Sequence, residues 1–300
     1  MEHRVTPGEA GKRLRDLLRQ DMRVSYTAMK SAKWEGRILV DGAPRRVDQP
    51  LREGELVTLL PAASVPAYRL TPCARPLCVA FEDEHLLVVD KPAPLASQSS
   101  ARQADDTLEN MAYAYFGCPA DFVYRPVNRL DKGTSGLMVI AKSAHAQQLL
   151  QRMLHTPDFR RVYLAVVEDA PEPAAGTVDA PIAKEDAASI RRVVDPGGKP
   201  SVTYYETLAR CENRSLVRLT LSTGRTHQIR VHMAHLGCPV CGDFLYGREL
   251  PELPGRFALH SAEIHLRHPL TGEALVLCSP LPEALAHLLG SSDPARDACR

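Results

Sequence analysis

Apolar positions near the start of the chain recur every three or four residues. Leu14, Leu17 and Leu18 have this spacing, which predicts a helix. A second helix is expected from Tyr26 to Trp34, because Gly36 then provides a stop signal. Two short helices are therefore predicted in this part of the chain.

The pattern then changes to short β-type runs that are separated by glycine turns. Residues 37–40 predict a strand, and Asp41-Gly42 predicts a tight hairpin turn after it. Residues 55–60 predict another strand after the Glu53-Gly54 turn. Residues 1–60 therefore predict a compact α+β module.

Residues 61–76 contain four prolines and little hydrophobic periodicity. Such a composition is typical of a linker between independently folded units. We therefore place a domain boundary in this segment.

Beyond the linker, short β-rich runs dominate. The expected strands are residues 77–81, 85–90, 137–141, 162–167, 203–208 and 216–221, and the expected helices are 107–116, 144–154 and 231–236. Strands and helices do not alternate regularly, so the pattern favours an α+β fold with a mixed, mainly antiparallel sheet. This domain is expected to span residues 77–290, followed by a disordered tail at 291–300.

Composition narrows the class of protein. A hydrophobic fraction of 44% supports well-packed cores. No apolar run approaches the roughly 20 residues that a membrane-spanning helix needs, and the first residues lack a signal-peptide core. The eight cysteines are scattered, unlike those of a secreted disulfide scaffold. We therefore expect a soluble, monomeric, cytoplasmic protein with reduced thiols.

The densest group of unusual residues is the segment 128–136, which reads NRLDKGTSG. Its two glycines allow a partner to approach the backbone closely. Arg129 and Lys132 flank Asp131 and would keep its carboxylate ionised. A polar turn with a solvated ion pair explains these residues equally well when they are considered alone.

A second group lies at residues 223–232, which read TGRTHQIRVH. Two arginines with His and Gln between them could bind phosphates and a base edge while one arginine pairs with a distant carboxylate. The structural alternative is that these residues form a hydrogen-bonded strand end. A short motif alone does not distinguish the two interpretations.

Together the two segments resemble the signature motifs of the RluA/RluD-type pseudouridine synthases. That family typically has HRLDxxTSGL and GRTHQIRxH, followed by a GDxxYG turn and a histidine-bearing apolar strand. This chain has NRLDKGTSGL, GRTHQIRVH, GDFLYG at 242–247 and LHSA at 259–262. The ordered match runs from residue 77 to residue 282. The resemblance implies an RNA-modifying isomerase that converts uridine to pseudouridine without a cofactor.

The resemblance also implies roles for individual residues. It makes Asp131 the catalytic carboxylate, Arg225 the arginine paired with it, and Tyr163 an active-site tyrosine. The residues expected to bind the substrate are Arg129, Lys132, Thr134, His227, Gln228 and Arg230. The carboxylate could attack the sugar or abstract a sugar proton, and both routes remain open. The uridine would first flip out of folded RNA.

Residues 1–60 are similar to the alpha-L RNA-binding module of ribosomal protein S-four, which many members of the family carry. This segment has 12 Lys or Arg residues and nine acidic ones, although the whole chain has a net charge of only +1. The residues expected to contact RNA are Arg15, Lys30, Lys33 and Arg37. The module implies structured ribosomal RNA of the large subunit as the substrate, with transfer RNA as the alternative.

Two positions depart from the family pattern. Asn128 stands where histidine is usual, which could alter how the catalytic loop is held. Pro94 stands where glycine is common, so the fit of the substrate around that loop can differ.

Other classes of function remain to be compared. A non-catalytic RNA-binding or ribosome-assembly factor could retain the same fold. A hydrolase could use Asp131 and His227, but the sequence shows no second well-placed carboxylate. Cys238 and Cys241 have CxxC spacing, yet no second such pair accompanies them, and no metal site is expected.

Overall fold

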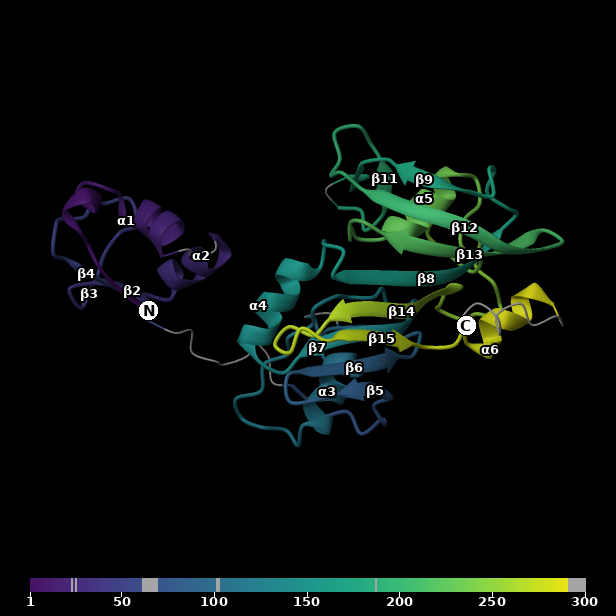
Figure 1. Cartoon of the computed structure of the whole chain (residues 1–300), viewed down its shortest axis with the longest axis horizontal. Coiled ribbons are helices and arrows are strands. Elements are labelled where there is room, and N and C mark those ends of the chain that lie inside the picture. Colours follow the sequence, from purple (N-terminus) through teal and green to yellow (C-terminus); the bar gives the residue numbers. More distant parts are fainter. Residues whose placement is uncertain (23, 25, 61–69, 101–102, 187, 291–300) are drawn as a thin grey trace. The chain divides into compact units, whose positions relative to one another are not determined.

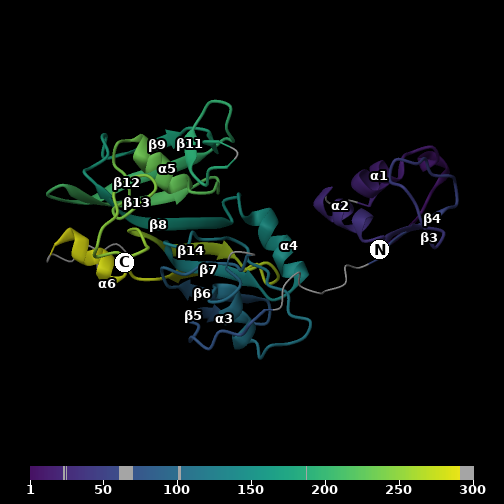
Figure 2. The ribbon, with the colours of Figure 1, turned by 180° about the vertical axis from the view of Figure 1, so that it is seen from behind.

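The computed structural model describes residues 1–22, 24, 26–60, 70–100, 103–186 and 188–290. Contacts between residues divide the chain into two compact units, Met1–Ala67 and Tyr68–Arg300. Figure 1 shows the chain with its elements labelled, and Figure 2 shows the same ribbon from behind. The boundary between the units falls within the segment 61–76, and the proposed tail at 291–300 lies outside the described residues.

The first unit combines short helices with a small antiparallel sheet. Its elements are β1 (Glu2–Arg4), η1 (Pro7–Glu9), α1 (Leu14–Asp16), η2 (Leu17–Asp21), α2 (Tyr26–Trp34), β2 (Ile38–Val40), β3 (Ala43–Pro44) and β4 (Leu56–Leu59). The strand order is β1-β4-β2-β3. Leu14, Leu17 and Leu18 are buried in the core of this unit, which confirms the predicted first helix. The hydrophobic pattern does not predict β1, because its residues Glu-His-Arg are all polar.

The second unit is built on a nine-stranded sheet. Its strands are β5 (Val79–Glu82), β6 (Leu86–Lys91), β7 (Ser135–Ala141), β8 (Phe159–Glu168), β9 (Ala175–Asp179), β12 (Val202–Cys211), β13 (Arg214–Leu221), β14 (Leu259–Arg267) and β15 (Ala274–Cys278). Their order is β5-β6-β7-β14-β8-β13-β12-β9, and β15 also pairs with β14. A separate hairpin joins β10 (Ile182–Lys184) and β11 (Arg192–Val194).

One pair of neighbouring strands is parallel and the other pairs of this sheet are antiparallel. The parallel pair is β7 with β14. The predicted mixed, mainly antiparallel α+β fold is therefore confirmed. The sequence pattern does not predict β9, β10, β11 or β15, which have three to five residues each.

The helices of the second unit are α3 (Leu108–Tyr115), α4 (Ala144–Met153), α5 (Gln228–His235), α6 (Glu283–Ala286) and the 3-10 turn η3 (His287–Leu289). Thr107 and Ser143 accept hydrogen bonds at the starts of α3 and α4, as N-cap residues typically do. The prediction of a helix at 231–236 places its start too late, because α5 begins at Gln228. None of the described helices is long and apolar enough to cross a lipid bilayer.

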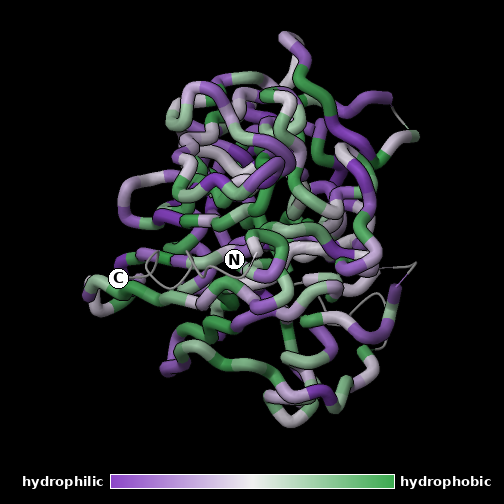
Figure 3. Tube along the Cα trace, turned by 90° about the vertical axis from the view of Figure 1, so that its right-hand side faces the viewer, coloured by the Kyte–Doolittle hydropathy of each residue, from purple (hydrophilic) through white to green (hydrophobic). Residues whose placement is uncertain are grey.

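Two apolar cores account for the packing of the sheet. The larger contains residues of β6, β8 and β13 together with α3 and α5, and a second one joins α4 to β7 and β14. Strands such as β7 are buried along their whole length, so both faces of this strand are covered. In Figure 3 hydrophobic stretches of the trace run through the interior, whereas many loops are hydrophilic.

A close approach of β7 to β14 holds the start of β7 beside the rest of the sheet. Gly136 has a φ of +106°, and a Cβ atom at this position would lie 2.3 Å from the backbone oxygen of Ser261. Only glycine fits such a contact without a shift of backbone. Gly136, the second glycine of the NRLDKGTSGL motif, therefore positions the strand that follows the loop with Asp131.

Two sequence predictions need correction. Residues 70–76 of the proposed linker are part of the second unit, because the side-chain amide of Asn110 donates to the carbonyl of Thr71 at 2.8 Å. The backbone NH of Cys73 also donates to the carbonyl of Asn110. The sequence also predicts a β-type segment at residues 122–127, but the structure has only an isolated bridge there, between Pro126 and Ile140.

Candidate functional site

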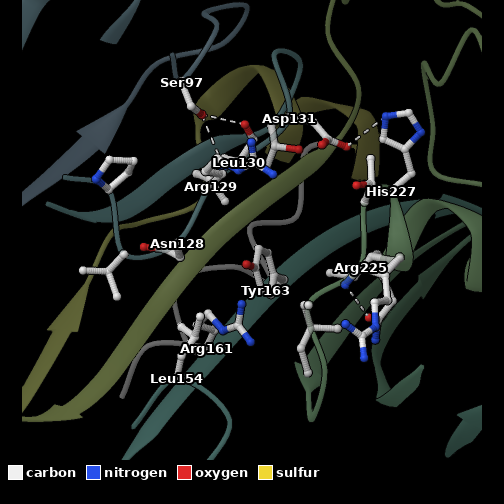
Figure 4. A pocket seen from close by; sticks show the side chains of 18 of the residues that line it. Ser97, Asn128, Arg129, Leu130, Asp131, Leu154, Arg161, Tyr163, Arg225 and His227 are labelled. Carbon is white, nitrogen blue, oxygen red and sulfur yellow. Dashed lines mark hydrogen bonds and ion pairs between the residues drawn. The ribbon is translucent and has the colours of Figure 1, made fainter. Parts of the chain in front are cut away.

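The two motif segments meet at one pocket in the second unit, with a volume of about 550 Å³. Residues 126–131 form one wall and residues 224–230 form another. Arg161 and Tyr163, both from β8, also line the pocket. Figure 4 shows these side chains around a common space. The fold therefore brings together segments that are about 100 residues apart in the sequence.

Asp131 is held by an arginine from helix α5. Nη1 of Arg230 lies 3.2 Å from Oδ2 of Asp131, whose side chain is 28% exposed. The other side of the same guanidinium donates to both carboxylate oxygens of Asp243, at 2.6 and 2.7 Å. The rings of Phe257 and Tyr246 lie over the guanidinium at 4.1 and 4.9 Å. This arrangement fixes Arg230 and, through it, the carboxylate of Asp131.

Burial and charge act in opposite directions on Arg230. Burial favours the neutral guanidine, but the hydrogen bonds and charges of Asp243 and Asp131 raise the pKa of Arg230 above its ordinary value. Arg230 therefore stays positively charged in its buried position. A charged partner next to Asp131 favours the carboxylate form that nucleophilic or base chemistry requires.

The predicted ion pair between Arg225 and Asp131 is wrong. Nε of Arg225 instead donates to the backbone carbonyl of Pro200 at 3.1 Å, although Arg225 does line the pocket. Helix α5 starts at Gln228, so Arg230 lies on its first turn and can face Asp131. Arg225 precedes this helix, and Figure 4 shows its side chain apart from that of Asp131.

His227 also lies next to the carboxylate of Asp131. Its Nε2 is 3.9 Å from Oδ2 of Asp131, and its Nδ1 is 2.8 Å from the hydroxyl of Tyr246. The Tyr246 oxygen already accepts the backbone NH of Arg192 at 2.8 Å, so its proton is available for Nδ1. Burial lowers the pKa of His227, and we assign it a neutral ring with Nε2–H toward Asp131.

Most of the predicted substrate-binding residues line the pocket. Arg129, Thr134, His227, Gln228 and Arg230 do so, with Arg129 exposed and Thr134 buried. Lys132 is exposed and is outside the set of lining residues. Lys132 lies in the turn that a hydrogen bond from the backbone NH of Thr134 to the carbonyl of Asp131 closes at 3.1 Å, and its side chain is on the outside of this turn.

Gln228 has a structural task in addition to lining the pocket. Its side-chain oxygen accepts from the backbone NH of Arg225 at 3.0 Å and from the hydroxyl of Thr223 at 2.8 Å. Its side-chain amide donates to the carbonyl of Val202 and to Thr203 on strand β12. Gln228 therefore fastens the GRTHQIRVH segment to the sheet.

Tyr163 lies within the pocket wall and is 5% exposed. Burial is the main reason that its pKa is raised, and the charge of Asp131 adds to this effect. The phenol is therefore neutral at physiological pH. Its ring is available for contact with a flat base.

The structure brings several residues to the site for which the sequence predicts no role. Asp243 and Tyr246 belong to the GDFLYG segment, and they hold Arg230 and His227. Their place in that motif is the signal that could have identified them. Arg161 precedes Tyr163 by two residues, and the period of a strand puts both on one face.

The two departures from the family pattern have different structural settings. Oδ1 of Asn128 accepts a hydrogen bond from the backbone NH of Val139 on β7 at 2.9 Å, so asparagine holds the loop with Asp131 against the sheet. Asn128 also lines the pocket, whereas Pro94 is outside the set of lining residues. The loop is therefore held at residue 128 without the usual histidine.

The CxxC pair is buried in the larger core. Cys238 and Cys241 are 4% and 0% exposed. Burial raises the pKa of the Cys241 thiol to about 12, which disfavours the thiolate that metals bind. Within the described ranges, no three His, Cys, Asp or Glu residues are grouped as a possible metal site.

Comparisons with known proteins agree with this site. A family model described as RNA pseudouridylate synthase matches residues 85–235, which include Asp131, Tyr163 and Arg230. Among curated proteins, the ribosomal large subunit pseudouridine synthase D of Xanthomonas campestris is 37% identical, over 98% of this chain and 94% of that protein. The protein of the same name from Pseudomonas aeruginosa is 36% identical, over 97% of this chain and 96% of its own.

Solved structures show the same relationship. Human RNA Pseudouridylate Synthase Domain Containing 1 superposes with a TM-score of 0.58 and 25% identity, over 70% of this chain and 87% of that one. Human RNA Pseudouridylate Synthase Domain Containing 4 has a TM-score of 0.56 and 26% identity, over 70% and 90%. This chain therefore belongs to the RNA pseudouridylate synthase family and is an RNA pseudouridine synthase, an isomerase.

Proposed function

We propose that the substrate of this synthase is ribosomal RNA of the large subunit and that Asp131 is its catalytic carboxylate. The single observation that carries the catalytic assignment is the Asp131 side chain at the pocket, 3.2 Å from Nη1 of the buried Arg230. The choice of RNA rests on relatives named ribosomal large subunit pseudouridine synthase D, which match nearly the full chain. Transfer RNA is the alternative substrate.

The reaction must break the bond between C1′ and uracil N1 and form a bond between C1′ and C5. The electron pair of the broken bond leaves with the base, C5 then attacks C1′, the proton on C5 is released to water, and N1 takes up a proton. Asp131 can add to C1′ as the base departs and leave when C5 attacks, or it can remove the C2′ proton to give a glycal and return a proton to C2′ when C5 adds. Both routes need the carboxylate form, which the positive charge of Arg230 favours.

Tyr163 and Arg129 have supporting roles in this proposal. The raised pKa of Tyr163 supports stacking of its neutral ring on the flipped base in preference to proton removal by a phenolate. Arg129 is exposed at the pocket and can contact the RNA backbone or occupy the space that the flipped base leaves. Flipping costs a few kcal/mol, which such contacts would offset.

We also propose that the first unit is an S-four-like module that contacts RNA. Arg15, Lys30 and Lys33 are exposed, which supports this role. Arg37 is committed to other contacts, since it pairs with Glu35 at 2.6 Å and donates to the carbonyl of Leu60. Arg15 is also paired, with Asp16 at 3.4 Å, so Lys30 and Lys33 are the stronger candidates for binding phosphates.

Release of tritium from uracil C5 tests the catalytic proposal, because only bond formation at that carbon frees the label. The substrates are ribosomal and transfer RNA, purified separately from labelled cells that lack this gene. We expect Asp131→Asn to slow release from ribosomal RNA by at least about 100-fold, since it removes the charge but not the volume. Asp121→Asn changes an exposed acid outside the pocket and should leave the rate unchanged.

Each outcome has a distinct meaning. Release from transfer RNA alone would overturn the choice of substrate and leave Asp131 as the catalyst. Equal rates for the intact protein and Asp131→Asn would remove Asp131 from catalysis. No release from either RNA would favour a non-catalytic RNA-binding or ribosome-assembly factor.

A further inference from the structure

A buried arginine in the pocket has hydrogen-bond donors that the protein does not use. Arg161 is 5% exposed, and its Nε and Nη2 have no hydrogen-bond partner within the described part of the chain. Burying a charged group without acceptors is unfavourable, and proteins generally pair such groups. Nε and Nη2 are buried, whereas Nη1 of Arg161 points toward Gly224 in the pocket wall, so Nη1 is the atom that an acceptor from a bound molecule could reach first.

Two other basic side chains lie at the same end of the pocket. A Cβ atom on Gly224 would be 3.2 Å from Nη1 of Arg161 and 3.7 Å from Cε1 of His155, so these two side chains flank one point. Arg161 and Arg225 both act on the pKa of His155, which is lowered by burial and then by these two charges. Arg225 follows Gly224 in the chain and also lines the pocket.

The charges of the pocket are divided between its two ends. Among the described residues that line it, Asp131 has the one carboxylate, and Arg230 is paired with that group. Arg161 and Arg225 have no carboxylate partner there. In Figure 4 Tyr163 lies between Asp131 and Arg161. The end with Arg161 therefore has excess positive charge.

We propose that Arg161, with Arg225 and His155, binds a backbone phosphate of the RNA next to the nucleotide whose base enters the pocket. A phosphodiester has a permanent negative charge and oxygens that can accept from several donors at once, which matches a buried guanidinium. A neutral carbonyl of uracil could accept a hydrogen bond, but it would not balance the charge. This inference rests on the proposed function, because it assumes an RNA substrate in this pocket.

Binding of small probes tests the phosphate site without requiring turnover. Uridine 3′,5′-bisphosphate should raise the Tm of the intact protein more than uridine does, and Arg161→Met should abolish this difference. Arg161→Lys keeps the charge and should retain part of the difference in Tm between the two probes. The matched control is Arg160→Met, because Arg160 is the preceding residue on β8 and lies outside this pocket.

The stability of the unliganded protein separates a binding role from a structural one. Arg161→Met replaces an unpaired buried charge by an apolar side chain of similar length, so we expect an unchanged or higher Tm without ligand. If Arg161 were needed for the fold, Arg161→Met would lower the Tm and weaken binding of uridine and the bisphosphate equally. That result would overturn the proposal.

Kinetics then identify the part of the RNA that Arg161 contacts. A phosphate contact is present in the ground state and the transition state, so Arg161→Met should raise KM for RNA by roughly 10- to 100-fold with little change in kcat. A lower kcat with unchanged KM would assign Arg161 to the departing base and overturn the phosphate site. Turnover by the intact protein with no effect of Arg161→Met would reject the site but leave the proposed function in place. If no RNA is turned over, the comparison of the two probes still decides the phosphate site.

Discussion

At the scale of single residues, the site depends on one arginine that connects two carboxylates. Arg230 contacts Asp131 on one side and Asp243 on the other, and Asp243 is 0% exposed. A buried pair of this kind contributes little net stability by itself, but the loss of one partner leaves an uncompensated charge. Arg230 should therefore matter for both the fold and the orientation of Asp131.

Variants of the two arginines distinguish their roles. Arg230→Met should lower the free energy of unfolding by about 3–5 kcal/mol, because it leaves Asp243 buried without its partner. Arg230→Lys keeps a charge but loses the two-pronged contact, so we expect a folded protein with reduced kcat. Arg225→Met should change KM more than kcat, since Arg225 has no contact with Asp131. Urea unfolding measures the stability of these variants, and tritium release measures their kcat and KM. A loss of kcat in Arg225→Met but not in Arg230→Lys would contradict the assigned roles.

The sequence identifies Asp131 but not its partner for a physical reason. The motif residues around Asp131 are close together in the chain, so their proximity can be predicted from the order of residues. The contact with Arg230 joins residues that are 99 positions apart, and it depends on where α5 begins. To decide whether Arg225 or Arg230 pairs with Asp131, one must therefore know at which residue α5 begins. Arg161 could not be singled out because its missing partners are visible only in the packed structure.

At the scale of elements, the position of the loop with Asp131 depends on the parallel pairing of β7 with β14. These strands pair in parallel at His260 with Ser135 and at Ser261 with Gly136. The long apolar strands are predictable from their composition, as β6, β7 and β13 illustrate. The short strands β9, β10 and β11 are not, because they have few buried apolar residues and depend on pairing with distant parts of the chain.

Gly136→Ala tests the close approach of these strands. A Cβ atom would lie 2.3 Å from the oxygen of Ser261, and the φ of +106° is unfavourable for alanine. We expect the free energy of unfolding to fall by at least about 3 kcal/mol, from the clash together with backbone strain. Gly272→Ala is the control, because Gly272 also has a positive φ but nothing within 4 Å of a Cβ. It should cost about 1 kcal/mol, and equal losses in both variants would argue against the close approach.

At the scale of the whole molecule, the chain has two units with separate hydrophobic cores. The change from helical spacing to β-rich runs, with prolines between them, locates this division in the sequence. The net charge of +1 gives no indication of RNA binding, whereas the distribution of charge does. Lys30 and Lys33 on the first unit, and the arginines of the pocket on the second, are the groups that we propose contact RNA phosphates.

The contribution of the first unit can be measured by the salt dependence of RNA binding. Lys30 and Lys33 are exposed on α2, so neutralising them should not disturb the core of the unit. The double variant Lys30→Gln/Lys33→Gln should bind ribosomal RNA more weakly, and the slope of log K against log salt should decrease by about 1 for each lost phosphate contact. Lys12→Gln removes a charge that is already paired with Asp21 at 3.1 Å, and it should have a smaller effect. If the double variant and Lys12→Gln have the slope of the intact protein, these lysines do not contact phosphates, and RNA binding must then be assigned to the second unit.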